Sequence, residues 1–501
     1  MICSLALMSC AELGSTLVIG DESAAQDPSD ASDSSDASDP AEGSDASDPT
    51  SQDVPATVFC RYHVTPEGGQ SGETWELPAD LSTALSQLGV HLAQDECESG
   101  EVWLQAGTYR PGQNSEDSFE LISGMTLYGG FAGNETTAAQ RNLGQQTTTL
   151  SGDLESGGKS SNVVRVIGQS DSEVRLDGLT VQGGDAAGTG TQSLGGGLYS
   201  SESRIRLVDV SFVSNQALSG GGLAIDGGVL SVERGRFVSN TASADGGAIM
   251  VAGSAVVITG LEMVSNTADR GGGLFLQDAS EVRLENTQWL TQAARLGGAI
   301  FDSGSQSFIL TRAQFQSNQG YEAGGALYLA LTQEPLIGNA TFFDNAAPAG
   351  ACLFADSISQ VSIAGVTMTG NVPGTGGSLE TAGSAVNVVN SILWNNVQEI
   401  STQAGGTVSV AWSIAPGTLT GDTLISEDPL FVRGPDELLV TDPNLALQAG
   451  SSAIDSGNNS LIPDGLGGTD AAGMGRRRDD LAVTDTGEGD APIVDRGAFE
   501  R

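Results

Sequence analysis

The stretch GGAIMVAGSAVVITGLEMVSNTADR, residues 246–270, is one unit of a pattern that occurs eight times between Gly195 and Asn396. Each unit opens with glycine and an aliphatic residue, and it closes with a large apolar residue followed three positions later by Asn or Gln. The opening aliphatic residues are Leu198, Leu223, Ile249, Leu274, Ile300, Leu327, Leu353 and Leu379. They recur every 25 to 27 residues, and a period this regular predicts stacked structural units.

Apolar and polar residues alternate in the middle of each unit. The apolar pairs are Ile205 and Leu207, Leu230 and Val232, Val256 and Ile258, Val282 and Leu284, Phe308 and Leu310, and Val361 and Ile363. A period of two is typical of strands with one buried face, whereas helical repeats need about 33–47 residues. We therefore predict that each unit is one coil of a parallel β-helix. Coils stacked at roughly 4.8 Å would build columns of matching side chains, and together they would bury a core that no single coil can bury.

The expected turn residues fit this architecture. Glycine pairs such as Gly246-Gly247 and Gly324-Gly325 let the backbone bend where a Cβ would clash. Asn tolerates the left-handed conformation and can hydrogen-bond within a turn. The recurring amides are Asn215, Asn240, Asn266, Gln292, Asn318, Asn345, Asn371 and Asn396. Stacked on successive coils, they could form an amide ladder, and we assign them a structural role.

Composition excludes some partners. The 501-residue chain has a net charge of −43. Lys159 is its only lysine, so arginines supply nearly all of the positive charge. This balance argues against binding nucleic acid or an anionic membrane surface. Excess carboxylate better suits the solubility of a secreted protein than recognition of a cationic partner.

The N-terminal residues are expected to direct export. Residues 1–20 form an apolar leader in which Leu7-Met8-Ser9-Cys10 resembles the lipobox of bacterial lipoproteins, whose cysteine is lipidated. A secretory signal and an irrelevant N-terminus are the alternatives, since no positive charge precedes Cys10. Residues 21–55 form an acidic linker of Asp, Ser, Ala and Pro, which we predict to be disordered. Its Asp spacing lacks the Gly turn and bidentate Glu of a calcium loop.

Residues 56–153 are predicted to hold an N-terminal cap and the first coils. Leu81 to Leu88 reads as a short helix, and Glu101 to Leu104 and Gly107 to Tyr109 read as strands. Cys60 and Cys97 flank this segment, and in an exported protein we expect a disulfide between them. Cys352 stands where other coils have small residues and is predicted to be a buried core residue.

Segments in the N-terminal and C-terminal parts of the chain resemble bacterial surface proteins. The segments EVWLQAGTY, residues 101–109, and LYGGFAGNET, residues 127–136, resemble the cap and first coils of right-handed parallel β-helix surface proteins of the pectin-lyase-like fold. DPLFV, residues 428–432, LALQAGSSAIDSG, residues 445–457, and DRGAFE, residues 495–500, resemble the choice-of-anchor Q domain. The central units resemble repeats of polymorphic outer-membrane proteins.

The resemblance implies an all-β protein: a right-handed parallel β-helix over residues 154–415, with the N-terminal cap before it and a β-rich choice-of-anchor Q-like domain over residues 416–501. It also implies export to the extracellular space or the outer-membrane surface of a bacterium. We expect any anchor to be the lipid on Cys10. The run from Arg476 to Asp480 is expected to be a solvated loop of mixed charge.

Catalysis is not expected, although the same fold hosts lyases and hydrolases. Glycoside hydrolysis needs convergent carboxylates. The outward positions of one strand are Ser211, Arg236, Glu262, Gln288, Gln314, Thr341, Thr367 and Ile392, and they form no acidic cluster. His63 and His91 lie in the cap, and Asp302, inward by parity, indicates a bulge or a polar site near a turn. We predict no catalytic residue, no metal site and no cofactor.

One feature favours binding. The residues after the opening aliphatics are expected to point outward, and they make an aromatic stripe of Tyr199, Phe275, Phe301, Tyr328 and Phe354. An exposed apolar stripe usually marks a partner site, and aromatic rings can stack on sugars. Alternatively, the C-terminal region covers the stripe, or the alternation fails there.

We therefore predict a non-catalytic, monomeric surface or secreted protein that is adhesin-like, a scaffold or glycan-binding. Its expected partner is an extracellular glycan or a cell-surface molecule. The alternative is a polysaccharide lyase or glycoside hydrolase.

Overall fold

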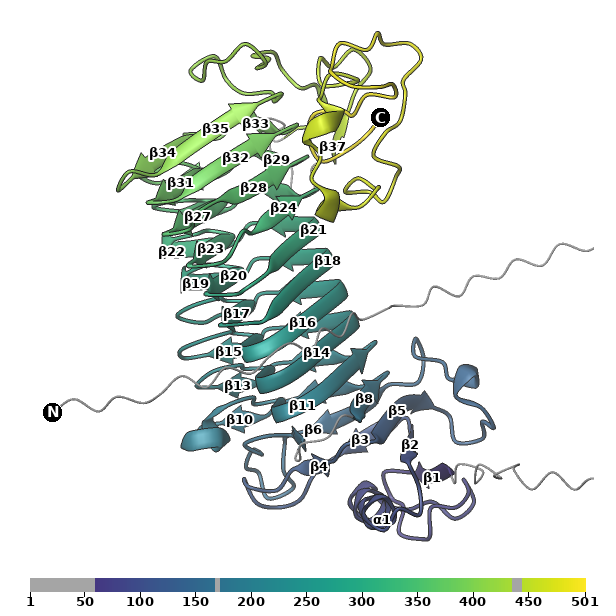
Figure 1. The fold of residues 1–501 in the computed structure, drawn as a ribbon. Coiled ribbons are helices and arrows are strands. Elements are labelled where there is room, and N and C mark those ends of the chain that lie inside the picture. Colours follow the sequence, from purple (N-terminus) through teal and green to yellow (C-terminus); the bar gives the residue numbers. More distant parts are fainter. Residues whose placement is uncertain (1–58, 167–171, 435–443) are drawn as a thin grey trace, which may run out of the picture. The chain divides into compact units, whose positions relative to one another are not determined.

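The computed structural model describes residues 59–166, 172–434 and 444–501, which belong to one compact unit, Thr57–Arg501. The described chain winds as a parallel β-helix, which confirms the predicted architecture (Figure 1). The leader, residues 1–20, the acidic linker, residues 21–55, and Cys10 lie outside the described residues, so their predicted roles stay predictions. Among the described residues, no helix is both long and apolar enough to cross a membrane.

Each coil contributes up to three strands, which we call first, second and third, to parallel columns. The first strands are β4 (Phe119–Leu121), β7 (Val164–Val166), the starts of β11 (Leu198–Val208), β14 (Leu223–Val238) and β16 (Ile249–Val264), then β17 (Leu274–Gln277), β20 (Ile300–Ser303), β23 (Leu327–Ala330), β27 (Leu353–Asp356), β31 (Leu379–Ala382) and β34 (Ile400–Gln403).

The second strands are β1 (Phe59–Val64), β2 (Ser99–Gln105), β5 (Met125–Phe131), β8 (Glu173–Asp177), later parts of β11, β14 and β16, the starts of β18 (Glu281–Leu290) and β21 (Phe308–Gln316), β24 (Leu336–Gly338), β28 (Val361–Ala364), β32 (Ala385–Val389) and β35 (Thr407–Ala411). The third strands are β3 (Gly107–Tyr109), β6 (Thr148–Ser151), β9 (Thr180–Gln182), β12 (Ser211–Val213), the ends of β14, β16, β18 and β21, β25 (Thr341–Phe343), β29 (Thr367–Thr369) and β33 (Ile392–Trp394).

Equivalent side chains stack in register inside the helix. Ile258 pairs with Leu284, and Leu284 pairs with Leu310, in parallel ladders. All three side chains are fully buried. In the preceding coils, Phe212 stacks on Phe237 with ring centroids 4.7 Å apart. The predicted columns are therefore present, and each layer buries the apolar face of the layer before it.

The predicted amide ladder is also present. Asn240 Nδ2 donates to Asn266 Oδ1 at 3.0 Å and to the Phe212 carbonyl of the preceding coil at 2.9 Å. The expectation that these Asn residues adopt the left-handed conformation is wrong. The residue before each takes it instead, as at Ser239 with φ of 54°. At the opening glycines the expectation holds, as at Gly246 with φ of 63°.

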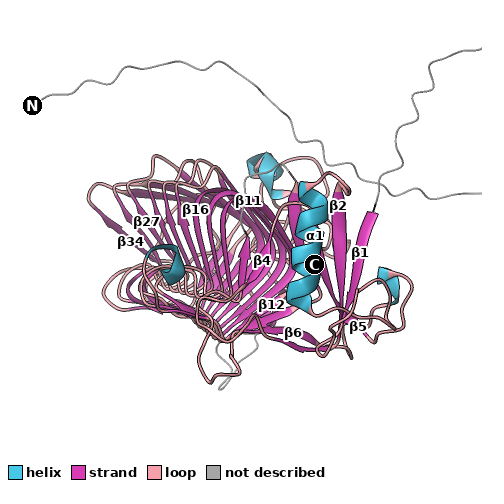
Figure 2. Ribbon diagram, turned by 90° about the horizontal axis from the view of Figure 1, so that it is seen from below, coloured by secondary structure: helices cyan, strands magenta, loops and turns pink. Residues whose placement is uncertain are grey.

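The N-terminal cap is built on one helix. α1 (Leu81–Ala93) is N-capped by Asp80, whose side chain accepts a hydrogen bond from the Thr83 amide at 2.9 Å. Its buried residues Leu85 and Leu88 join the solenoid core. The predicted disulfide between Cys60 and Cys97 is confirmed. α1 thereby closes the N-terminal end of the stack (Figure 2).

Short strands run beside the three columns, between the amide ladder and the opening glycines. They are β10 (Asp185–Ala186), β13 (Gln216–Ala217), β15 (Thr241–Ala242), β19 (Ala293–Leu296), β22 (Gln319–Ala323), β26 (Ala346–Ala347) and β30 (Val372–Pro373). They form a three-stranded and a four-stranded parallel sheet. We call them the side sheets.

The C-terminal region, residues 416–501, of which 416–434 and 444–501 are described, docks against the last coils (Figure 1). Its strand β37 (Asn444–Leu447) pairs antiparallel with β36 (Phe431–Arg433), and its other described residues form turns and short 3-10 helices, η3 (Asn459–Leu461) and η4 (Asp464–Leu466). The region therefore contributes one two-stranded sheet. The remaining 3-10 helices are η1 (Ala138–Gln140) and η2 (Gly190–Ser193).

Polar contacts fix this docking. The Asn390 side chain donates to the Asn458 carbonyl at 2.9 Å and accepts from its amide at 2.8 Å. Arg476, expected in a solvated loop, is 4% exposed and pairs with Glu500 at 3.2 Å. That expectation is wrong for Arg476 and right for Arg477 and Arg478, which are exposed. Only the first arginine is buried, because it fills the space beside the αL corner at Gly365.

Candidate binding groove

The aromatic stripe is not an open surface. Tyr199, Phe275, Phe301 and Phe354 are between 2% and 9% exposed, and Tyr328 is half-buried. Their rings stack on each other, with centroids 5.0 Å apart for Phe301 and Tyr328. The expectation that the stripe is exposed for a ligand is therefore wrong.

The side sheets bury the stripe, which is the physical reason for this correction. A Cβ added at Gly324 would lie 2.9 Å from Tyr328 Cβ, so the returning chain packs closely against the base of this side chain. The Arg270 guanidinium lies 4.9 Å from the Phe275 ring centroid while pairing with Asp245 at 2.7 Å. Each coil thus forms a second apolar layer between its first strand and its own returning segment.

An open concavity lies on another face, along the bend between second and third strands. Two adjoining hollows of about 370 and 460 Å³ share Asn286 and Gln288. Their lining on the solenoid includes Asp209, Ser211, Arg234, Arg236, Glu262, Asn286, Gln288, Arg312, Gln314, Thr341 and Phe343. We call this the corner groove. It includes the outward third-strand positions from Ser211 to Thr341.

A left-handed residue makes each bend of the groove. Arg234, Asn286 and Arg312 have φ between 51° and 54° at successive or near-successive corners. A single such residue turns the chain sharply between two strands, so the second and third strands meet at an angle. Because the same bend recurs in each coil, the groove runs along the stack rather than across it.

The charged groups of the groove are paired between coils. Arg234 binds Asp209 through two hydrogen bonds of 2.8 and 2.7 Å, and this contact raises the pKa of Arg234. Arg236 Nε lies 3.0 Å from Glu262. Exposed pairs of this kind contribute about 0–1 kcal/mol each. Their main effect is to hold the guanidinium groups in place along the wall.

The C-terminal region closes one end of the groove. Arg433, Asn444, Leu445, Ala471 and Phe499 line its last part. Beyond it the outward positions Thr367 and Ile392 are buried, and Thr367 Oγ1 accepts from the Ala498 amide at 3.0 Å. The region expected as a possible cover for the aromatic stripe thus covers the third-strand face instead.

Asp302 is the buried acid that the sequence marked as unusual. It keeps the strand register between Leu276 and Leu329, so the strand has no bulge. Its carboxylate accepts hydrogen bonds from the Ser305 and Thr332 hydroxyls. Burial raises the pKa of Asp302 to about 6, although both hydroxyl contacts oppose the rise. It is a polar site near a turn, enclosed in the core.

The histidines and Cys352 lie away from the groove. His63 sits in the cap against Trp75 and Trp103, and burial lowers its pKa. His91 contacts Glu96 in the same part of the molecule. Cys352 is fully buried as predicted, and burial raises the pKa of its thiol.

Sequence reasoning identified the outward third-strand positions but did not recognise them as a groove. The missing signal was the left-handed corner, because glycine occupies it in some coils, as at Gly260, whereas Asp209, Arg234, Asn286 and Arg312 occupy it in others. Asp, Asn and Arg do not by themselves predict the left-handed conformation, although Asn and Asp adopt it more readily than most residues.

No protein-family model matches this chain, and no curated protein sequence does. The resemblance to the choice-of-anchor Q domain and to polymorphic outer-membrane protein repeats therefore stays an expectation. Three solved structures are similar to it: the pectate lyase Pel9A, the A-module of the Azotobacter vinelandii mannuronan C-5 epimerase AlgE4, and PfbA, a surface adhesin of Streptococcus pneumoniae.

Pel9A is 13% identical over 89% of this chain and 97% of its own, with a TM-score of 0.43. The epimerase module is 14% identical over 69% of this chain and 96% of its own, with a TM-score of 0.33. PfbA is 9% identical over 70% of this chain and 93% of its own, with a TM-score of 0.25. These TM-scores are too low to support an argument about what this chain does.

Proposed function

We propose that this chain is an extracellular β-helix protein that binds an extended glycan in the corner groove without cleaving it. One observation carries the proposal: an open groove with exposed or half-exposed polar side chains at the same position of successive coils. Gln288 and Gln314 stand on consecutive coils, flanked by Arg236 and Arg312. Amides and guanidinium groups on a rigid sheet are suited to hydrogen-bonding the hydroxyls of a regular sugar chain.

The ion pairs favour binding over catalysis. Asp209 and Glu262, the carboxylates that line the groove, each bind an arginine of a neighbouring coil. A general acid or base must be able to exchange a proton with the substrate, and a guanidinium partner stabilises the ionised carboxylate instead. Activity as a lyase or hydrolase is therefore the alternative function, and the product assays described below test it.

Location outside the cell is supported by the disulfide between Cys60 and Cys97, because such bonds persist in oxidising compartments. Attachment through a lipid on Cys10 remains part of this proposal, as does a monomeric state. An exported, tethered binder would hold its glycan at the cell surface.

The test is a glycan array probed with the full chain, beside assays for reducing ends and unsaturated uronides on the retained glycans. The double variant Gln288→Ala/Gln314→Ala removes two groove amides and leaves the ion pairs intact. We expect the dissociation constant to rise about tenfold or more, which corresponds to loss of one or two hydrogen bonds.

The matched control is Gln277→Ala/Gln306→Ala, which removes two exposed amides outside the groove and should leave retention unchanged. Equal retention by the groove variant and the control would exclude the corner groove as the site. Release of new reducing ends or unsaturated products would refute the non-catalytic function.

A further inference from the structure

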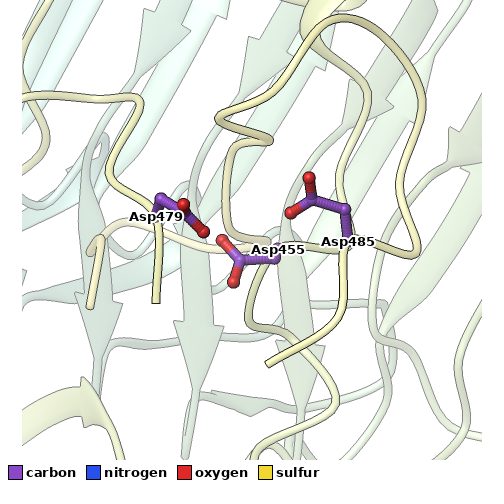
Figure 3. A group of neighbouring side chains, drawn as sticks. All are labelled: Asp455, Asp479 and Asp485. Atoms are coloured by element: carbon purple, nitrogen blue, oxygen red, sulfur yellow. The ribbon is translucent and has the colours of Figure 1, made fainter. Parts of the chain in front are cut away.

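Three aspartates converge in the C-terminal region, away from the corner groove. One carboxylate oxygen from each of Asp455, Asp479 and Asp485 lies within 4.8 Å of the others. Figure 3 shows the three side chains turned toward one another from separate segments of the chain. Asp479 and Asp485 are exposed, whereas Asp455 is fully buried.

Asp455 lacks the partners that a buried carboxylate needs. Neither Oδ1 nor Oδ2 has a hydrogen bond of normal geometry, although both atoms are buried. Burial and the charges of Asp485 and Asp479 raise the pKa of Asp455 to about 6, with the backbone amide of Asp480 opposing. An unpaired buried charge is costly, and two further carboxylates beside it increase that cost.

The backbone holds Asp455 in this position. Its amide donates to Asp495 Oδ1 at 2.8 Å, and its carbonyl accepts from the Thr486 amide at 2.9 Å. Asp455 also has φ of 48°, in the left-handed region. The contact with Thr486 places the preceding Asp485 beside it. The convergence of carboxylates is thus imposed by the fold, and it does not depend on one flexible side chain.

We propose that Asp455, Asp479 and Asp485 bind a calcium ion. Carboxylate oxygens are the ligands that this hard cation prefers, at about 2.3–2.6 Å, so oxygens on opposite sides of one ion are about 5 Å apart. The three carboxylate oxygens, all within 4.8 Å of one another, are close enough together to bind one such ion. Three protein carboxylates favour Ca²⁺, which takes six to eight oxygen ligands in flexible geometry, over Mg²⁺, which is usually bound through one or two carboxylates.

The ion would neutralise the charge at Asp455 and join three segments of the C-terminal region. The exposed side, formed by Asp479 and Asp485, leaves room for water ligands, which complete the coordination of Ca²⁺ in many sites. Since Asp455 also hydrogen-bonds Asp495, and Asp495 packs with Glu500, binding would be transmitted to the contacts that dock this region on the solenoid.

The test is thermal unfolding of the full chain, treated with chelator and then titrated with CaCl₂, with MgCl₂ in parallel. At about one hundred times the dissociation constant, Ca²⁺ should raise the melting temperature by about 3 °C for a chain of this length. Terbium luminescence gives an independent measure of binding. We expect Asp485→Asn, a change at an exposed position, to weaken binding about tenfold or more.

In the absence of calcium, Asp455→Asn is not expected to lower the melting temperature. It removes the unpaired charge and keeps the shape, so without calcium it should melt at or above the wild-type temperature, and calcium should not shift it. Asp226→Asn, an exposed carboxylate on the solenoid, is the matched control for charge and for weak binding elsewhere. An equal calcium shift in Asp455→Asn or Asp485→Asn and in the control would overturn the site. An equal shift with Mg²⁺ would overturn the assignment to calcium.

Discussion

The solenoid and the C-terminal region are stabilised in different ways. Inside the solenoid, matched apolar side chains such as Ile258 and Leu284 fill successive layers, and the recurring polar row consists of neutral amides. The C-terminal region has only a small apolar cluster around Ile454 and Leu445. Its buried ionisable groups contact one another, among them Arg476, Glu500 and Asp495.

This difference has an energetic consequence. A repeated apolar layer loses only its local contribution when one side chain is truncated, because neighbouring layers interact pairwise. A buried charge network depends on every member, since the loss of one partner leaves another charge unpaired in a medium that cannot solvate it. We therefore expect the two parts to respond differently to substitution and to pH.

The largest effect should follow from Arg476→Met. Removing one partner of a buried ion pair costs about 3–5 kcal/mol, and the Arg476 and Glu500 side chains are 5% and 0% exposed. Amide hydrogen exchange should accelerate across residues 455–501 and stay slow in the solenoid core. Arg477→Met, at the exposed neighbouring position, is the control. If both variants behave alike, or if the whole solenoid loosens, the two parts are not stabilised separately.

A smaller effect concerns pH and the end of the amide ladder. Glu399 accepts two hydrogen bonds from Asn396, yet burial raises its pKa to about 7. Between pH 4.5, the ordinary pKa of the group, and about pH 7, Glu399 is therefore protonated in the folded state and ionised in the unfolded state. Stability should fall as pH rises from about 4.5 to about 7, by up to about 3 kcal/mol.

Glu399→Gln should flatten this dependence in denaturant unfolding curves recorded across the same window. Glu281→Gln, at an exposed position of the solenoid, should leave it unchanged. An unaltered slope in Glu399→Gln would show that the pH dependence of the solenoid arises elsewhere.

The smallest effect should come from repairing the ladder at Gln292. Its Nε2 donates to the Leu290 carbonyl of its own coil at 2.7 Å, whereas Asn266 Nδ2 reaches both neighbouring coils. Gln292→Asn should restore those contacts and raise the free energy of unfolding by about 1 kcal/mol. Gln277→Asn, outside the ladder, should have no effect. A lower denaturation midpoint for Gln292→Asn would mean that the longer side chain fits this coil better.

Sequence predicted the solenoid well because repetition multiplies weak signals. One alternating segment is ambiguous, but Val282 and Leu284 recur in register with equivalents on either side. The burial of Phe301 could not be predicted in this way. The segment that covers it is short, rich in glycine and without apolar periodicity, so nothing in its composition shows where it returns.

The sites away from the repeat were harder still. Asp455, Asp479 and Asp485 meet through turns whose path depends on single contacts, such as the hydrogen bond from Thr486 to Asp455. Each aspartate by itself resembles the many other acidic residues of a chain with 63 of them. The corner groove was intermediate between the solenoid core and the aspartate cluster in how well it could be predicted. Its side chains recur with the repeat, but the sequence did not reveal the bend that makes a concavity.

The helix α1 at the N-terminal end has a consequence for self-association. Strands that match along a whole stack would equally match those of a second molecule, so an uncovered first coil is a template for end-to-end polymerisation. Leu85 and Leu88 of α1 occupy that end, and the disulfide from Cys60 to Cys97 keeps the helix joined to β1. Reduction of the disulfide would release this restraint, and α1 would then be held at that end by its buried side chains alone.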